Sequence, residues 1–90
     1  MNIARHCIIK GSVQGVFYRQ ATYEKARALG LKGFVQNLKN GDVECLICGK
    51  EDLVLELCRW LEKGPPAAHV QQVIINEIPF REYESFVIRR

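Results

Sequence analysis

Two glycines and an arginine within nine residues are the part of the sequence best suited to chemistry. Gly11 and Gly15 follow an apolar run that ends at Ile9, and Arg19 stands at the start of an amphipathic segment. The glycines therefore lie where a strand passes into a helix. The first N–H groups of a helix lack intrahelical partners, and glycines let a loop turn its own N–H groups onto the same ligand. Arg19 would add a planar fork of charged donors, so this pattern predicts an anion site.

The spacing of these residues matches none of the familiar nucleotide-binding motifs. The sequence has no Gly-x-Gly-x-x-Gly here, and no Lys-Ser or Lys-Thr closes the loop as in a P-loop. The residues alone therefore predict phosphate or another oxyanion, held by backbone amides and Arg19. They fit equally well a plain turn in which the glycines serve only the backbone and Arg19 is a solvated charge.

The composition is that of an ordinary globular protein, and we expect residues 1–90 to form a single domain. The chain has 90 residues, of which 48% are hydrophobic and 26% charged. No segment approaches the roughly 20 apolar residues of a membrane span, and Met1 to Arg5 leads directly into a strand-like run without a signal region. We therefore expect a soluble, cytoplasmic monomer that does not bind membranes. The net charge of +3 is spread along the chain, which suits a small anionic substrate better than nucleic acid.

The four cysteines, Cys7, Cys45, Cys48 and Cys58, do not form a metal or redox motif. Cys45 and Cys48 lie in a run that we interpret as a strand, where residues three apart point to opposite faces. We expect all four to be small buried hydrophobic residues and expect no metal site. A disulfide between Cys7 and Cys45 or Cys48 stays open, because the sequence does not give the redox compartment.

Apolar periodicity predicts five strands and two helices. The first helix carries an apolar stripe from Tyr18 to Leu29 and ends at Gly30, and the second is stopped by Gly64 and two prolines. The order is that of a ferredoxin-like split βαβ sandwich of the α+β class, with two helices on one face of a mostly antiparallel sheet and a short fifth strand. The predicted strands are residues 3–10, 31–38, 43–48, 70–77 and 83–89, and the predicted helices are 18–29 and 51–63.

This topology brings two distant parts of the sequence together. The first and third strands are central, and the loop after the first strand lies at the same end of the sheet as the end of the second strand. Asn37 should therefore lie near the loop from Gly11 to Arg19. A binding loop with a polar partner at the same edge is a candidate active site.

Two spaced motifs stand on this pattern. The first is Ile9-x-Gly11-x-Val13-Gln14-Gly15-Val16-x-Tyr18-Arg19, and the second is Gly33-Phe34-Val35-Gln36-Asn37 followed by Gly41, Val43 and Gly49. Both resemble the motifs of acylphosphatases, small enzymes that hydrolyse the carboxyl-phosphate bond. The resemblance covers essentially the whole chain. Tyr18 departs from the Phe or Met usual in the family, and we expect the added hydroxyl to leave the reaction intact. Ser12 stands at a variable position of the pattern.

The resemblance implies a role for each residue of the site. Arg19 would bind the phosphate together with the backbone amides of the loop, and the side-chain amide of Asn37 would orient the attacking water. The family uses no metal and no cofactor and forms no phosphoenzyme. The residues expected to bind the phosphoryl group are Gln14, Gly15, Val16, Phe17, Tyr18 and Arg19.

The chemistry of acyl phosphates agrees with this division of roles. The leaving group is a carboxylate, which needs little acid catalysis, and the transition state spreads negative charge over the equatorial oxygens. Fixed N–H donors and Arg19 would stabilise that charge, while Asn37 would supply proximity. Because Asn is not a general base, the proton of the water would pass to the substrate phosphate or to solvent.

Two other functions are compatible with the sequence. RNA-recognition modules share this topology, but they present exposed aromatic residues on the central strands, where this chain has Cys7, Ile9, Cys45 and Ile47. The second alternative is a family domain that recognises a related anhydride, such as carbamoyl phosphate, within a larger maturation machine. Because the domain fills the chain, we expect a stand-alone enzyme that acts on a small acyl phosphate and does not bind nucleic acid.

Overall fold

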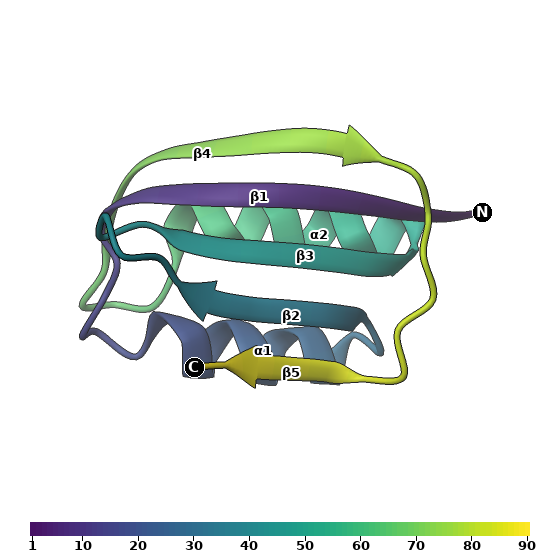
Figure 1. Cartoon of the computed structure of the whole chain (residues 1–90), viewed down its shortest axis with the longest axis horizontal. Coiled ribbons are helices and arrows are strands. Elements are labelled where there is room, and N and C mark those ends of the chain that lie inside the picture. The colour runs from purple at the N-terminus through teal and green to yellow at the C-terminus, as the bar shows by residue number, and fades with distance from the viewer.

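The computed structural model describes all 90 residues and has the predicted α+β, ferredoxin-like architecture (Figure 1). Two helices pack on one five-stranded sheet, which confirms the predicted fold class. Along the chain, the elements are β1 (Asn2–Ser12), α1 (Tyr18–Ala28), β2 (Lys32–Asn37), β3 (Val43–Lys50), α2 (Glu51–Lys63), β4 (His69–Ile78) and β5 (Phe86–Arg89).

The strand order β4-β1-β3-β2-β5 puts β1 and β3 in the centre of the sheet. Neighbouring strands are antiparallel except β2 and β5, which are parallel. Because β3 runs antiparallel to both of its neighbours, β1 and β2 point in the same direction. The loop that leaves β1 and the end of β2 therefore meet at one edge, as the topology predicts.

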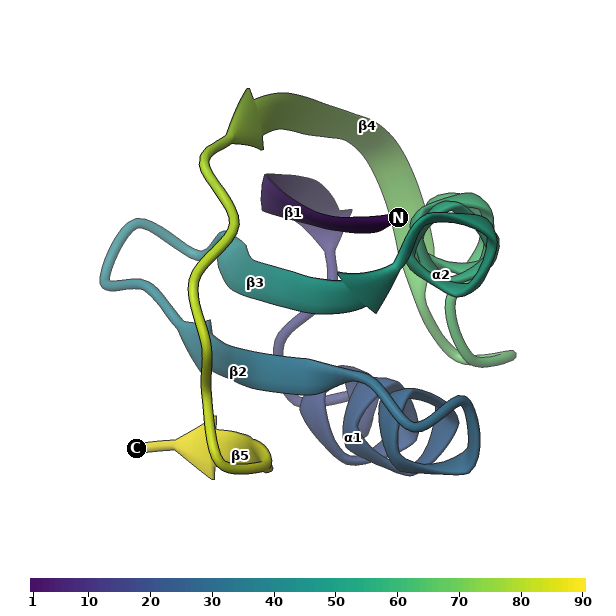
Figure 2. The ribbon, with the colours of Figure 1, turned by 90° about the vertical axis from the view of Figure 1, so that its right-hand side faces the viewer.

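Both helices cover the same face of the sheet, as Figure 2 shows from one end. α1 contacts β2 and β5, and α2 contacts β1, β3 and β4. The residues that point to this face form the main core. It contains Cys7, Ile9, Val13, Tyr18, Ala26, Leu31, Val35, Val43, Cys45, Ile47, Val54, Leu57, Cys58, Leu61 and Phe86.

The segment that joins β4 to β5 crosses the opposite face of the sheet (Figures 1 and 2). It covers a small second cluster that contains Phe34 and Cys48, and the Tyr83 ring meets the Phe34 ring at a centroid distance of 6.5 Å. The expected fifth strand from Tyr83 is therefore too long. It begins only at Phe86, because Tyr83 is held over the sheet face and not in the ladder.

Three further expectations are corrected by the packing. Gly11 lies inside β1 and not in the loop, at a bulge where a Cβ atom would collide with the carbonyl of His69. The sequence pattern predicts an apolar stripe on α2 of Leu53, Leu57, Trp60 and Leu61 with Val54 and Cys58 at its edge, whereas the buried residues are Val54, Leu57, Cys58 and Leu61. The strands β1, β3 and β4 also extend beyond their expected ends, because their outer residues continue the ladder.

All four cysteines are buried and free. Cys45 belongs to the main core and Cys48 to the cluster on the other face, as the predicted strand requires. The open disulfide possibility is thus not realised. Neither helix has the length and apolar character that crossing a bilayer would demand.

Candidate active site

The loop between β1 and α1 has a backbone shape that few residues adopt. Gly15 has a φ of 75° and Phe17, which caps the helix, has a φ of 63° and a ψ of 23°. A left-handed conformation is ordinary for glycine but costs an L-residue such as Phe roughly 1–2 kcal/mol. Residues held in this way concentrate at binding sites, because the surrounding fold fixes the loop in one shape.

The backbone N–H groups of residues 14–20 donate no hydrogen bond within the chain. The N-cap of α1 has no side-chain hydrogen bond, and no acidic residue lies in its first turn. The other helix differs, since α2 has Glu51 and Asp52 in its first turn and its Glu51 N–H donates to the carbonyl of Met1. The N-terminus of α1 is therefore the one left available to an anion from outside.

Gln14 ties this loop to the hairpin between β2 and β3. Its Nε2 donates to the carbonyl oxygens of Leu38 and Asp42, at 2.8 Å in each case. Asp42 is itself fixed, because its carboxylate accepts from Lys10 at 2.7 Å and its N–H donates to the side chain of Asn40. The side chain of Gln14 thus sets the distance between the loop and the end of β2.

Asn37 is the last residue of β2 and lines the same pocket as the loop. Its side-chain amide makes no hydrogen bond in the chain, and its Oδ1 is a buried acceptor without a partner. A buried acceptor left in this state costs about 1–3 kcal/mol. A donor that enters the pocket, such as a water O–H, would recover that free energy.

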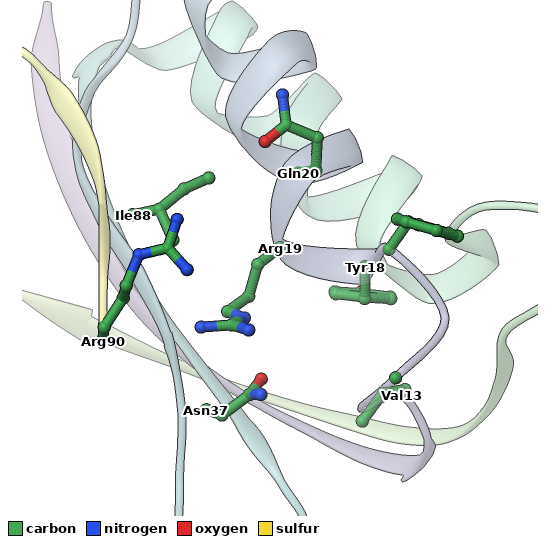
Figure 3. A pocket seen from close by; sticks show the side chains of 9 residues that line it. Val13, Tyr18, Arg19, Gln20, Asn37, Ile88 and Arg90 are labelled. Atoms are coloured by element: carbon green, nitrogen blue, oxygen red, sulfur yellow. The ribbon is translucent and has the colours of Figure 1, made fainter.

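Arg19 extends from the first turn of α1 into this pocket, toward Asn37 (Figure 3). Its Nη1 donates at 3.5 Å to the carbonyl oxygen of Arg89, and it forms no ion pair. The pocket has a volume of about 480 Å³ and contains no acidic residue. It is lined by Val13, Gly15, Phe17, Tyr18, Arg19, Gln20, Asn37, Ile88 and Arg90.

The side chains of Val16, Phe17 and Tyr18 differ in where they lie. The Phe17 ring is 82% exposed, and Val16 is half-buried against the core. Tyr18 is 1% exposed, and its ring lies 5.9 Å from the Trp60 ring. The N–H groups of all three have no partner in the chain, and the Tyr18 ring packs in the core at the start of α1.

Ile88 and Arg90 are pocket residues that the sequence interpretation missed. They follow from the parallel pairing of β5 with β2, in which Gln36 is opposite Arg89. The next residues, Asn37 and Arg90, therefore stand side by side at the pocket. The alternation of apolar residues predicts the strand β5, but it does not say that β5 pairs with β2.

The pocket combines two guanidinium groups, a row of unpaired amides and an unpaired side-chain amide. This set can hold a phosphate dianion and a water molecule next to it. No group of three or more His, Cys, Asp or Glu side chains is placed to hold a metal ion.

A family model for acylphosphatase matches residues 5–88 of the chain. The chain belongs to the acylphosphatase family. An acylphosphatase of Pseudomonas paraeruginosa is 44% identical to it over 88 residues, which is 98% of this chain and 97% of the relative. Family membership supports hydrolysis of acyl phosphates, and so a hydrolase.

Solved structures agree with the family assignment. The structure of an acylphosphatase from Coxiella burnetii covers 98% of this chain, which in turn covers 93% of that one, with a TM-score of 0.94 and 42% sequence identity. Full-length HypF, solved in a phosphate- and nucleotide-bound form, matches all of this chain with 26% identity and a TM-score of 0.87. This acylphosphatase chain covers only 12% of HypF.

Proposed function

We propose that this acylphosphatase hydrolyses acyl phosphates by direct attack of water at phosphorus, with the phosphoryl group held between the α1 loop and Arg19. The observation that carries this proposal is that the N–H groups of residues 14–20 have no partner in the chain, and that five of these residues line a pocket without acidic residues. An acyl phosphate brings two negative charges to these donors. As the transition state forms, charge on the equatorial oxygens increases, and donors already in place stabilise it without reorganisation.

Each residue then has a limited task. The guanidinium of Arg19 offers a bidentate contact to two phosphoryl oxygens. The side-chain amide of Asn37 holds the water next to phosphorus, in line with the leaving carboxylate. Asn37 therefore positions the water and does not accept its proton. As the new P–O bond forms, the bond to the acyl oxygen breaks, and the proton of the water goes to the phosphate or to solvent. No metal, cofactor or phosphoenzyme enters this scheme.

Release of phosphate from acetyl or benzoyl phosphate, measured with a chelator present, tests the scheme. Arg19→Ala should lower kcat/KM by at least about 10²–10³-fold, as for other donors to a developing oxyanion. Arg19→Lys should also be severe, because a point charge does not reproduce the fork. Arg27→Ala, at the other end of α1, removes the same charge away from the pocket and is the matched control.

The role of Asn37 is tested separately from binding. Asn37→Ala should lower kcat while inhibition by inorganic phosphate stays nearly unchanged, because the loop amides and Arg19 remain. Activity that is lost on adding chelator, or that survives Arg19→Ala, would refute the scheme as stated. A variant of Asn37 that turns over normally but no longer binds phosphate would refute its water-positioning role.

A second substrate to test is carbamoyl phosphate, the related anhydride that the sequence leaves open as an alternative. HypF was solved with phosphate and nucleotide and is far longer than this chain. Comparing turnover of acetyl phosphate with that of carbamoyl phosphate distinguishes a general acyl phosphate hydrolase from a domain specialised for that anhydride. We expect hydrolysis of acetyl phosphate, since the loop amides, Arg19 and Asn37 act on the phosphoryl group and the water and not on the acyl group.

A further inference from the structure

Asp42 is the only acidic residue of the chain that is buried, and the proposed reaction assigns it no role. It is 8% exposed, and the other buried polar residue is Thr22. Asp42 stands in the turn between β2 and β3, directly before β3 begins. A buried carboxylate is costly unless it is paired and hydrogen-bonded. The partners that satisfy it therefore show what this residue holds in place.

The carboxylate of Asp42 binds the end of β1. It accepts from Nζ of Lys10 at 2.7 Å and from Nδ2 of Asn40 at 3.1 Å. Lys10 is the last residue before the register of β1 shifts at Gly11. The carboxylate side is only 11% exposed, so salt screens this ion pair less than a pair of fully solvated charges. The pair therefore fixes β1 just before the chain enters the phosphate loop.

The backbone of Asp42 binds the two other parts of the site. Its carbonyl oxygen accepts from the N–H of Leu38 and from Nε2 of Gln14, at 2.8 Å in each case. Leu38 directly follows Asn37, and Gln14 belongs to the loop. One residue thus connects the end of β1, the phosphate loop and the end of β2.

The register of the sheet puts these contacts in the row next to Asn37. Asn37 pairs with Val43 in the last row of the ladder between β2 and β3. Leu38 and Asp42 form the following row, and the ion pair with Lys10 extends this row to β1. The end of a strand opens locally when few contacts hold it. Asn37 keeps its place because the row beyond it is tied on both sides.

We propose that Asp42, paired with Lys10, is a positioning residue that fixes Asn37 relative to the phosphate loop. This inference rests on the proposed function, in which Asn37 holds the attacking water. Asp42 does not line the pocket, so it acts through the hairpin and not on the substrate. Loss of the ion pair lets the hairpin move, and a displacement of about 1 Å can cost on the order of 10²-fold in rate.

Hydrolysis of benzoyl phosphate by the whole chain, with inhibition by inorganic phosphate measured beside it, tests this inference. Asp42→Ala should lower kcat about tenfold, which is part of what a displacement of about 1 Å can cost. The inhibition constant of phosphate should stay near its wild-type value, because the loop amides and Arg19 remain. Asp42→Asn keeps an oxygen that accepts from Lys10, so it should recover part of the loss.

Lys10→Met tests the other half of the ion pair. It should lower kcat as Asp42→Ala does, and the double variant should be little slower than either single variant, because the two side chains act as one unit. If Asp42→Ala does not fold, Lys10→Met and Asp42→Asn decide the question. Wild-type kcat in Lys10→Met, or phosphate inhibition weakened as much as kcat falls, would overturn the inference.

Lys25→Met and Asp52→Ala are the matched controls. Lys25→Met breaks the surface ion pair of 3.5 Å with Glu56, and Asp52→Ala removes an acidic side chain from the first turn of α2. Both should keep the wild-type kcat, even where urea unfolding shows a loss of stability. A fall in kcat that tracks stability across all these variants would also overturn the inference. Activity of the wild type that depends on Arg19 would still uphold the proposed function, whereas a wild type that hydrolyses no acyl phosphate would remove both proposals.

Discussion

The hydroxyl of Tyr18 donates a hydrogen bond of 2.6 Å to the carbonyl oxygen of Leu61. Leu61 lies in the last turn of α2, where carbonyl groups have no intrahelical partner. Burial raises the pKa of the Tyr18 hydroxyl, which keeps it a protonated donor. The hydroxyl that departs from the family pattern therefore joins the start of α1 to the end of α2 and stands outside the phosphate site.

Tyr18→Phe should lower the free energy of unfolding by about 1–3 kcal/mol, because it leaves a buried carbonyl without a donor. The value of kcat should stay near that of the wild type, since the ring still supports the loop. Urea unfolding measures the first effect and phosphate release the second. Tyr23→Phe, whose hydroxyl accepts from Arg27 on the surface, should change stability far less. Equal stability of the two variants would contradict this role.

Gln14→Ala should weaken catalysis without unfolding the protein. It removes both hydrogen bonds between the loop and the hairpin, so the amides and Asn37 lose their fixed separation. A misplacement of about 1 Å can cost on the order of 10²-fold in rate. Steady-state kinetics should show a fall in kcat larger than any rise in KM, with an unchanged circular dichroism spectrum. Gln72→Ala, on the exposed strand β4, is the control and should behave as the wild type.

Phe17 offers a test of backbone strain. Phe17→Gly should be as stable as the wild type or up to about 1 kcal/mol more stable, because relief of the left-handed conformation outweighs the entropy that glycine adds to the unfolded chain. Phe17→Val should be less stable, because a β-branched residue fits this conformation worse. The two variants lose the same exposed ring, so their difference in urea unfolding isolates the backbone. A valine variant as stable as the glycine variant would remove the evidence for strain.

The ion pair between His6 and Glu44 predicts a dependence of stability on acid pH. The hydrogen bond from His6, at 2.7 Å, lowers the pKa of Glu44 below its ordinary value of 4.5. A carboxyl whose pKa is lower in the folded state binds fewer protons there, so its contribution to stability is present above pH 4.5 and is lost as the pH falls through the folded pKa. Glu44→Gln should therefore flatten the decrease in stability below that pH. Glu56→Gln, which removes a surface pair of 3.5 Å with Lys25, should leave the decrease intact.

Most of the fold and half of the site could be predicted from the sequence, because local patterns determine them. Gly15 and Arg19 indicate where the chain passes from β1 into α1, and the split βαβ order then puts Asn37, at the end of β2, beside the loop. The periodicity of α2 gave the bounds that the structure has, Glu51–Lys63. These conclusions needed no knowledge of distant contacts.

The rest depends on contacts that a local pattern does not contain. β5 has only four residues, and nothing in its alternation says which edge of the sheet it joins. Ile88 and Arg90 were missed for that reason. For Gln14 the sequence predicts only a role of its backbone amide. The contacts of its side chain are with Leu38 and Asp42, which lie 24 and 28 positions later in the chain.

The pocket is lined by residues that are far apart in the sequence, with Gly15 on one side and Arg90 on the other. The short strand β5 is held by a single neighbour, so local opening of this edge would separate those two sides. A bound phosphate would fix Arg19, whose Nη1 donates to the carbonyl oxygen of Arg89, and so would oppose this opening. Amide hydrogens of β5 should then exchange more slowly with deuterium when phosphate is bound, while those of the central strand β1 should exchange at nearly the same rate.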